Sequence, residues 1–300
     1  MSQYIRCARE TGYNMGQPYC DTVIFPVRCP KKGRRSLGKP TTPAQEAVNE
    51  RNAIMHFERV TNANFQEGRD VKVDLTFDKW NLPATRRDCK RVTDNFIRRV
   101  KRAWKARGLE PELRYLYVIE GNDGKRFHVH LLMTGGLTVN VIRDLWGMCD
   151  ILNVRVLQAN KNGYEALSVY LTKQGKLADG EHRWYGSRNL VKPDYAERNA
   201  HIPMAEVEEL GKYIQDVMDA GEGDIPTAER YAPIEELYPG YYCAKAEAKY
   251  LEQFHDWIIH VKLYRKDTRA GVEEANRRRD EEKAIKARKK LLAEFEGRVK

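Results

Sequence analysis

The chain has 300 residues, of which 41% are hydrophobic and 32% charged, so it can build a core and keep a charged surface. Lysine and arginine total 53 against 43 acidic residues, a net charge of +10, which favours an acidic polymer such as nucleic acid as the partner. No apolar run approaches the roughly 18 residues of a membrane span, and the first residues lack a signal peptide's apolar core. We therefore expect a protein that stays in the cytoplasm where it is made.

Residues 1–42 contain several prolines and glycines and the basic run 28–35. Proline and glycine interrupt regular structure, and like charges repel one another. We predict a loosely ordered arm that contacts nucleic-acid phosphates, with a merely solvated tail as the alternative. The six cysteines form no C-x-x-C pair, which argues against a zinc ribbon or a disulfide framework. A metal site built from Cys7, Cys20 and Cys29 is left open.

Hydrophobic periodicity predicts the elements that follow this arm. In chain order we expect helix 43–62, strand 71–77, helix 85–107, strands 114–120 and 126–133, helix 137–149, strand 153–157, and helices 163–173 and 203–220. After these we expect a strand over 257–264 and a charged, exposed helix over 267–300. Helix 85–107 is strongly basic, and its apolar residues recur every four positions on one face. No P-loop motif is present.

Two histidines alternate with apolar residues in the strand 126–133. Side chains at i and i+2 of a strand share a face, so His128 and His130 should lie side by side. If residues 123–125 form a three-residue hairpin loop, Glu120 lies directly opposite His128. One carboxylate with two imidazoles suits Mg²⁺ or Mn²⁺, with open positions for water or phosphate. A register shifted by one residue would move Glu120 to the other face, and cross-strand hydrogen bonding by the histidines is the alternative reading.

A tyrosine and a lysine lie one turn apart on the predicted helix 163–173. Tyr170 and Lys173 are neighbours at i and i+3. A tyrosine phenol can attack phosphorus and hold the product as an ester, and a nearby ammonium favours the phenolate or stabilises the leaving oxygen. Tyr164 lies six residues earlier, and at 100° per residue it turns to another face. We therefore predict one nucleophilic tyrosine, against the alternative that Tyr170 only packs.

Taken together, these motifs resemble those of the HUH endonuclease superfamily, and specifically the rolling-circle replication initiators of small single-stranded DNA phages and plasmids. The pattern is Glu120-x₇-His128-x-His130 followed by Tyr170-x-x-Lys173. The strand 74–77 is similar to the family's first motif, which ends in a Leu-Thr-aromatic run. Some relatives carry an acidic residue after the motif lysine, where this chain has Gln174. The resemblance covers roughly residues 43–190.

The resemblance implies a fold, a reaction and partners. The expected fold is α+β, with a central antiparallel sheet of about five strands, flanking helices and a mainly helical C-terminal extension. Glu120, His128 and His130 would hold a divalent metal, Mg²⁺ or Mn²⁺, that polarises the scissile phosphate. Tyr170 would attack single-stranded or hairpin origin DNA to give a 5′-phosphotyrosine, with Lys173 assisting. A helicase and a polymerase of a bacterial host would complete replication, since the chain lacks a P-loop.

The DNA contacts and the domain limits follow from the same reading. Basic and aromatic residues of helix 85–107 and of loop 183–188 are expected to contact DNA, namely Arg98, Arg102, Arg183, Trp184, Tyr185 and Arg188. For Trp184 and Tyr185 the alternative is packing against the core. We predict a basic arm over 1–42, an HUH endonuclease domain over 43–198, a C-terminal α/β extension over 199–266 and a charged helix over 267–300.

Three other functions remain open at this stage. Another HUH enzyme, such as a mobilisation relaxase or a transposase, would make the same nick for a different purpose. A DNA-binding module with structural histidines would be inactive. A cupin-like metal oxygenase also uses His-x-His and Glu, but it needs a closed β-barrel and a further histidine, which the helix-rich pattern argues against.

Overall fold

In this computed structural model the described residues are 7–27, 42–121, 126–173, 181–193, 195–219, 226–252 and 255–299. The chain divides into two compact units. The central unit comprises Thr41–Ala159 and Tyr164–Pro193, and the terminal unit comprises Met1–Pro40, Asn160–Gly163 and Asp194–Lys300. Each unit is described by itself below.

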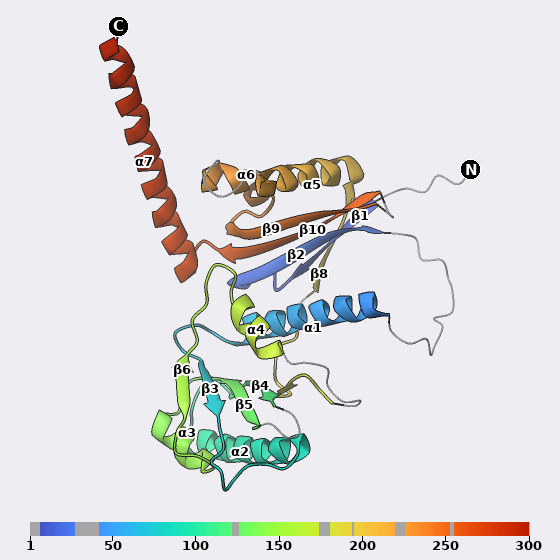
Figure 1. Cartoon of the computed structure of the whole chain (residues 1–300), viewed down its shortest axis with the longest axis vertical. Helices are drawn as coiled ribbons and strands as arrows, with labels where there is room; N and C mark the ends of the chain where they lie inside the picture. The colour runs from blue at the N-terminus through green and yellow to red at the C-terminus, as the bar shows by residue number, and fades with distance from the viewer. Residues whose placement is uncertain are drawn as a thin grey trace, which may run out of the picture. The chain divides into compact units, whose positions relative to one another are not determined.

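The central unit is a five-stranded antiparallel sheet between two layers of helices. Its elements are α1 (Pro43–Asn64), β3 (Val71–Leu75), α2 (Arg86–Ala106), β4 (Tyr115–Glu120), β5 (His128–Met133), α3 (Val139–Trp146), β6 (Asn153–Val156), α4 (Glu165–Thr172) and β7 (Tyr185–Gly186). The strand order is β6-β3-β5-β4-β7, with α2 and α3 on one face and α1 and α4 on the other (Figure 1). The predicted α+β class is confirmed, as are the helices and strands predicted between residues 43 and 173.

Alternation along the strands explains the two layers. Val73, Val129 and Leu131 point to the α2 face, where they are completely buried together with Phe96 of α2. Positions one residue away point to the opposite face, where Leu132 packs with apolar side chains of α1 and α4. Because both faces are covered by helices, the strands are apolar on both sides over most of their length. Polar residues on one face of these strands are therefore exceptions that need a reason.

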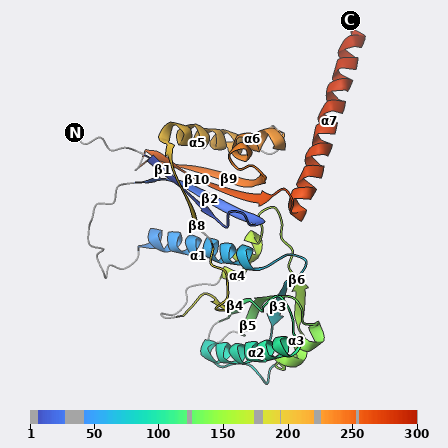
Figure 2. The ribbon, with the colours of Figure 1, turned by 180° about the vertical axis from the view of Figure 1, so that it is seen from behind.

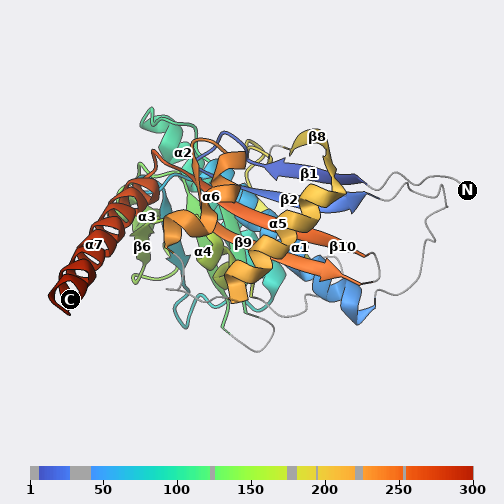
Figure 3. The same ribbon diagram turned by 90° about the horizontal axis from the view of Figure 1, so that it is seen from above.

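The terminal unit has a second antiparallel sheet. Its elements are β1 (Cys7–Tyr13), β2 (Tyr19–Val27), β8 (Tyr195–Pro203), α5 (Met204–Asp219), α6 (Thr227–Leu237), β9 (Tyr241–Leu251), β10 (Asp256–Arg265) and α7 (Arg269–Val299). The strand order is β8-β1-β2-β10-β9, and α5 and α6 cover one face (Figures 2 and 3). The predicted helices α5 and α7 and the strand β10 are present. No described helix is both long and apolar enough to cross a membrane.

The N-terminal segment differs from the prediction. A loosely ordered arm over residues 1–42 is wrong for residues 7–27, which form β1 and β2. These strands pair with β8 and β10, so their partners lie more than 170 residues away in the sequence and leave no local signal. Cys20 is a buried thiol of this sheet. The basic run 28–35 and Cys29 lie outside the described residues.

The predicted domain limits also change at the C-terminal side. The arm and the C-terminal extension were expected as separate regions, but β1 and β2 lie in the same sheet as β8, β9 and β10. The C-terminal extension therefore holds strands as well as helices. Burial of Ile24 beside Ile259 and Val261 shows that the N-terminal strands complete this core. Residues from both ends of the chain are needed to build the terminal unit.

Candidate metal and nucleophile site

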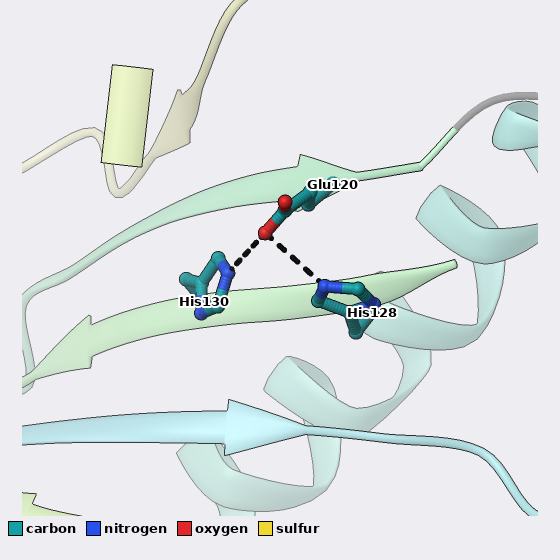
Figure 4. Close-up of side chains that lie close together, drawn as sticks. All are labelled: Glu120, His128 and His130. Carbon is teal, nitrogen blue, oxygen red and sulfur yellow. Dashed lines mark hydrogen bonds and ion pairs between the residues drawn. The ribbon is translucent and has the colours of Figure 1, made fainter. Parts of the chain in front are cut away.

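The two histidines and the glutamate meet on the α4 face of the central sheet. In the register of β4 and β5, Glu120 pairs with His128, as the hairpin argument predicted. His130 follows two residues later on the same face. The side chains from the two strands converge as Figure 4 shows. One ligand atom from each residue lies within 4.8 Å of the other two, and this is the only such group of metal-ligating side chains among the described residues.

Both imidazoles direct Nε2 to one carboxylate oxygen. Glu120 Oε2 lies 2.7 Å from Nε2 of His130 and 3.1 Å from Nε2 of His128. The His130 side chain is only 6% exposed, whereas those of His128 and Glu120 are 38% and 47% exposed. The site therefore has a buried side fixed by His130 and an open side that a phosphate from solvent can approach.

Asp74 of β3 holds the ring of His130 from the other side. The two residues are directly opposite each other in the sheet, and Asp74 Oδ1 lies 2.6 Å from Nδ1 of His130. Asp74 also pairs with Lys72 and accepts a hydrogen bond of 2.8 Å from Nδ2 of Asn153 on β6. When Nδ1 of His130 donates to Asp74, Nε2 keeps the lone pair that a metal requires.

The charges around the cluster keep both carboxylates ionised. Burial raises the pKa of Asp74, but the hydrogen bond from His130 and the ammonium of Lys72 outweigh this and hold the pKa at about 2. Burial likewise raises the pKa of Glu120, and its hydrogen bond with His130 and the charge of His128 bring it below its usual value. Both groups are therefore anionic at neutral pH, and Glu120 can act as a metal ligand.

The backbone beyond Glu120 is shaped to end the strand there. Gly121 has φ +109°, and a Cβ at this position would lie 2.9 Å from the carbonyl oxygen of Arg126. Only glycine fits without displacing the chain. The buried Arg86 of α2 donates to the carbonyl oxygen of Ile119 at 2.9 Å. These contacts fix the end of β4, and with it the position of the Glu120 side chain.

Tyr170 is the tyrosine that faces the cluster. Its ring centroid lies 5.6 Å from that of His130, and the residue is 59% exposed. Tyr164, at the start of α4, is 2% exposed and packs in the core with Phe57 and Leu132. The helical rotation that separated the two tyrosines in the sequence therefore corresponds to one accessible ring and one buried ring.

The lysine next to Tyr170 comes from the sheet. Lys72 Nζ lies 5.8 Å from the ring centroid of Tyr170. Lys173 is exposed at the C-terminal end of α4. Gln174, where some relatives have an acidic residue, lies outside the described residues. The acidic side chain that the structure does bring to the histidines from a third strand is Asp74.

The chemistry of this donor set fits a divalent metal. Two imidazole nitrogens and one carboxylate oxygen lie on one face and leave further coordination positions for water or phosphate. The carboxylate–histidine pair formed by Asp74 and His130 is the arrangement that orients metal-bound histidines in many proteins. The ring nitrogens offer ligands that suit Mn²⁺ better than Mg²⁺.

The predicted DNA contacts on α2 lie away from the cluster. Arg98 and Arg102 are exposed on α2, which covers the opposite face of the sheet from α4. The basic side chains on the cluster's own face are Lys72, Arg155 and Lys173, and Arg155 on β6 donates to a neighbouring asparagine at 3.2 Å. A DNA strand at the cluster would therefore meet these residues first.

The aromatic residues predicted to stack on DNA bases are packed against protein. Trp184 lies edge-on to Phe57 with 5.3 Å between ring centroids, and Tyr185 stacks on Tyr117 at 5.1 Å. These contacts are the packing alternative for both residues.

The two arginines predicted beside these rings have different surroundings. Arg183 lies 3.6 Å from the carboxylate of Glu50 on α1. Arg188 is exposed in the segment that follows β7. Arg183 is therefore engaged in an ion pair, and its contact with DNA stays a prediction, as does that of Arg188.

Sequence reasoning missed three polar residues of the cluster. Lys72 and Asp74 lie in β3, the latter within the segment similar to the first motif, and Asn153 is on β6. The alternation of Lys72 and Asp74 with apolar residues places them on one face, so a common face was readable from the sequence. That this face is the one bearing His130 follows from strand order, which the sequence did not specify.

The fold and the site define an α+β unit in which a two-histidine, one-carboxylate cluster lies beside an exposed tyrosine. A family model described as a replication-associated protein of the ORF2 type matches residues 71–175. The match runs from β3 to just beyond α4, so it contains the whole cluster as well as Tyr170 and Lys173. It confirms the resemblance to rolling-circle replication initiators over these residues and supports a replication role and DNA binding. No curated protein and no solved structure matches the chain.

Proposed function

We propose that the central unit nicks and rejoins single-stranded origin DNA to start rolling-circle replication. The observation that carries the proposal is the placement of Tyr170, exposed and 5.6 Å from His130 between ring centroids, beside the histidine–glutamate cluster. A nucleophile and a metal-ligand set on one face of a rigid sheet are what transesterification of a phosphodiester requires. The match of residues 71–175 to the replication-associated family favours an initiator over a relaxase or a transposase.

In the proposed reaction Tyr170 Oη attacks the scissile phosphorus. The new O–P bond forms as the P–O3′ bond breaks, so the phosphate stays on Tyr170 as a 5′-phosphotyrosine and the 3′ oxygen leaves as a hydroxyl that primes synthesis. Later a 3′-hydroxyl attacks this phosphotyrosine, restores the phosphodiester and frees the tyrosine. A divalent metal bound by Glu120, His128 and His130, Mn²⁺ or Mg²⁺, would polarise the phosphate and stabilise its developing negative charge.

Other residues have supporting roles in this proposal. Lys72, near the nucleophile's ring, favours the phenolate over the phenol by its positive charge. Lys173 and Arg155, both exposed on the same side, contact phosphates of the bound strand or the leaving oxygen. Asp74 orients His130 without touching the DNA. A host helicase and a polymerase would then separate and copy the strands.

The decisive experiment traps the covalent intermediate. The purified full chain is incubated with Mn²⁺ and a pool of single-stranded hairpin oligonucleotides, denatured with detergent, and separated on a gel. We expect a protein–DNA adduct whose bound DNA reveals the preferred sequence, and mass spectrometry should place the nucleotide on Tyr170.

Two controls separate the proposal from its rivals. Tyr170→Phe should form no adduct, whereas Tyr164→Phe, a change to the buried tyrosine of the same helical segment, should still form it. An adduct that persists in Tyr170→Phe would show that another residue is the nucleophile. Absence of any adduct, with DNA binding retained, would favour the non-catalytic DNA-binding module.

A further inference from the structure

An exposed tryptophan stands at the end of the central sheet where the cluster lies. Trp80, in the loop after β3, is 82% exposed, more than any other large apolar residue of the described chain. The tryptophans at 104, 146 and 257 are at most 9% exposed, and Trp184 is packed against α1. Leaving an indole in water forgoes the burial that usually stabilises this side chain. An exposed aromatic ring of this size on a DNA-binding unit is typical of an interaction site.

The loop that carries Trp80 is held by a compact hydrogen-bond network. The Asp78 carboxylate accepts from the backbone N–H groups of Trp80 at 2.9 Å and Asn81 at 3.0 Å. Asn81 Nδ2 also donates to the carbonyl oxygen of Met148 at 3.3 Å, and Asp78 N donates to the same oxygen at 3.0 Å. The Asp78 charge is therefore directed at backbone donors. The loop presents Trp80 from a fixed backbone, so stacking on it costs little ordering entropy.

Positive charge surrounds the indole. Lys79 Nζ lies 4.5 Å from the centroid of the Trp80 ring, over its face. Arg126 is exposed, and its guanidinium donates to the carbonyl oxygen of Phe77 at 2.7 Å, which fixes it beside the same loop. An aromatic face with an ammonium and a guanidinium beside it matches a nucleotide, which has a base to stack and a phosphate to neutralise.

The position of the loop relates it to the cluster. Leu75, the last residue of β3, pairs with Val129, so the chain leaves β3 at the end of the sheet where β5 begins with His128. The cluster's glutamate pairs with His128 at this same end. Trp80 follows Leu75 by five residues, and Arg126 precedes His128 by two. A single strand lying across the cluster therefore reaches this loop at that end of the sheet.

We infer that Trp80 is a stacking platform for an unpaired base of the single-stranded DNA, with Lys79 and Arg126 contacting the adjoining phosphates. The inference rests on the proposed function, because it assigns part of the binding surface for the same substrate. It replaces Trp184 and Tyr185, whose rings are packed on protein, as the source of base stacking. Stacking tolerates any base, so this contact adds affinity and positions the strand without selecting sequence.

The test measures binding apart from cleavage. The full chain carrying Tyr170→Phe, which cannot form the covalent bond, is titrated against a fluorescein-labelled oligodeoxythymidylate of about 20 nucleotides. We expect Trp80→Ala in this background to weaken binding about tenfold, and Trp80→Phe to weaken it no more than about threefold. Val48→Ala, at an apolar residue that is 51% exposed on α1, is the matched control and should bind like the parent. Trp80→Ala removes only exposed surface, so the fold should be unaffected.

Salt and duplex DNA separate stacking from charge. Trp80→Ala should leave the salt dependence of binding unchanged, whereas Lys79→Ala should lower the slope of log K against log salt by about 0.7. A duplex of the same length has no unpaired base, so Trp80→Ala should not weaken its binding. Quenching of the exposed Trp80 fluorescence on addition of the single strand supports the stacking directly.

Three results would overturn the inference. These are unchanged single-strand binding by Trp80→Ala, an equal loss of duplex binding, and equal weakening by Val48→Ala. In each case covalent adduct formation by the wild-type chain still tests the proposed function separately. A parent protein that binds no single-stranded DNA would contradict both proposals, and adduct formation without a role for Trp80 would contradict only this one.

Discussion

The two faces of the central sheet are built from the same strands but differ in chemistry. On the α2 face, Val129 of β5 and Val73 of β3 are completely buried among apolar side chains. One residue further along, His130 and Asp74 form a hydrogen-bonded pair 2.6 Å apart on the α4 face. The α2 face is a continuous hydrophobic core, whereas the α4 face combines a small core with a polar, partly open cluster.

The difference shows how the strands divide two tasks between odd and even positions. The apolar face supplies the burial that stabilises the unit and makes the strands rigid. The other face can then hold ionised groups at fixed separations, which reduces the reorganisation that catalysis or metal binding would otherwise require. Substitutions on the α2 face should therefore affect stability, and substitutions on the α4 face should affect chemistry.

The largest expected effect is on the α4 face at the nucleophile. Tyr170→Phe removes one oxygen from a side chain that is 59% exposed, so the free energy of unfolding should change by less than about 0.5 kcal/mol. Nicking of single-stranded DNA should fall at least about a thousandfold, since no other group replaces the phenol. Gel assays of cleavage and denaturant unfolding measure the two quantities. A variant that nicks like the wild type would remove Tyr170 from the mechanism.

The next effect concerns the metal ligands. His128→Ala should reduce Mn²⁺-dependent nicking by about a hundredfold or more, because one of three protein ligands is lost. The His128 side chain is 38% exposed, so the melting temperature of the metal-free protein should change little. Calorimetric titration with Mn²⁺ alone reports the ligand loss without any reaction. Unchanged Mn²⁺ affinity would mean that His128 is a structural residue.

The matching substitution on the α2 face should have the reverse signature. Phe96 is fully buried between α2 and the sheet, so Phe96→Ala should lower the free energy of unfolding by about 3–5 kcal/mol. The fraction that remains folded should still bind Mn²⁺ with wild-type affinity, because the cluster is on the other side of the sheet. Loss of Mn²⁺ binding by the folded fraction would show that the two faces are coupled more closely than the comparison implies.

A smaller effect is expected for the residue that orients His130. Asp74→Asn preserves shape but removes the anion that accepts from Nδ1, so Mn²⁺ affinity should fall by about 10–100-fold. Asn153→Ala removes only a hydrogen bond to Asp74 and should have a milder effect. Nitrogen NMR of the imidazoles can show directly whether the His130 tautomer changes. If Asp74→Asn binds Mn²⁺ as tightly as the wild type, Asp74 has no role in positioning the ligand.

The smallest expected effect distinguishes the two lysines. Lys72→Met should slow single-turnover nicking at saturating DNA by about tenfold, because it removes the ammonium near the Tyr170 ring. Lys173→Met should mainly weaken DNA binding and its salt dependence, as expected for an exposed phosphate contact. Measuring rate and affinity separately for both variants decides the assignment. A larger rate loss in Lys173→Met would return the catalytic role to the motif lysine.

Short-range patterns account for most of what the sequence predicted correctly. The alternation in 126–133 and the hairpin spacing predicted that Glu120 lies opposite His128, and the register of β4 and β5 confirms it. The apolar repeat of α2 identified Phe96 and Trp104 as buried. These features depend on neighbouring residues and on fixed strand and helix periods, so they are readable without the rest of the fold.

Long-range pairing accounts for what was missed. Residues 7–27 read as an irregular arm because their strand partners are β8 and β10, near the other end of the chain. Asp74 could be placed on a face of β3 but not beside His130, since that requires knowing that β3 pairs with β5. Trp184 and Tyr185 looked like DNA-stacking residues, and only the fold shows the protein rings against which they pack.

The sequence by itself determined which residue types are present, their periodicity, and the motif spacing that brings Glu120 to His128. Tertiary structure alone decided which distant side chains complete the cluster, through a strand order that places β3 beside β5 and α4 over their common face. The physical reason is that propensity and periodicity act over a few residues, whereas strand order is set by burial of the whole apolar surface. Asp74, Lys72 and Tyr170 gather around His130 as a consequence of that burial.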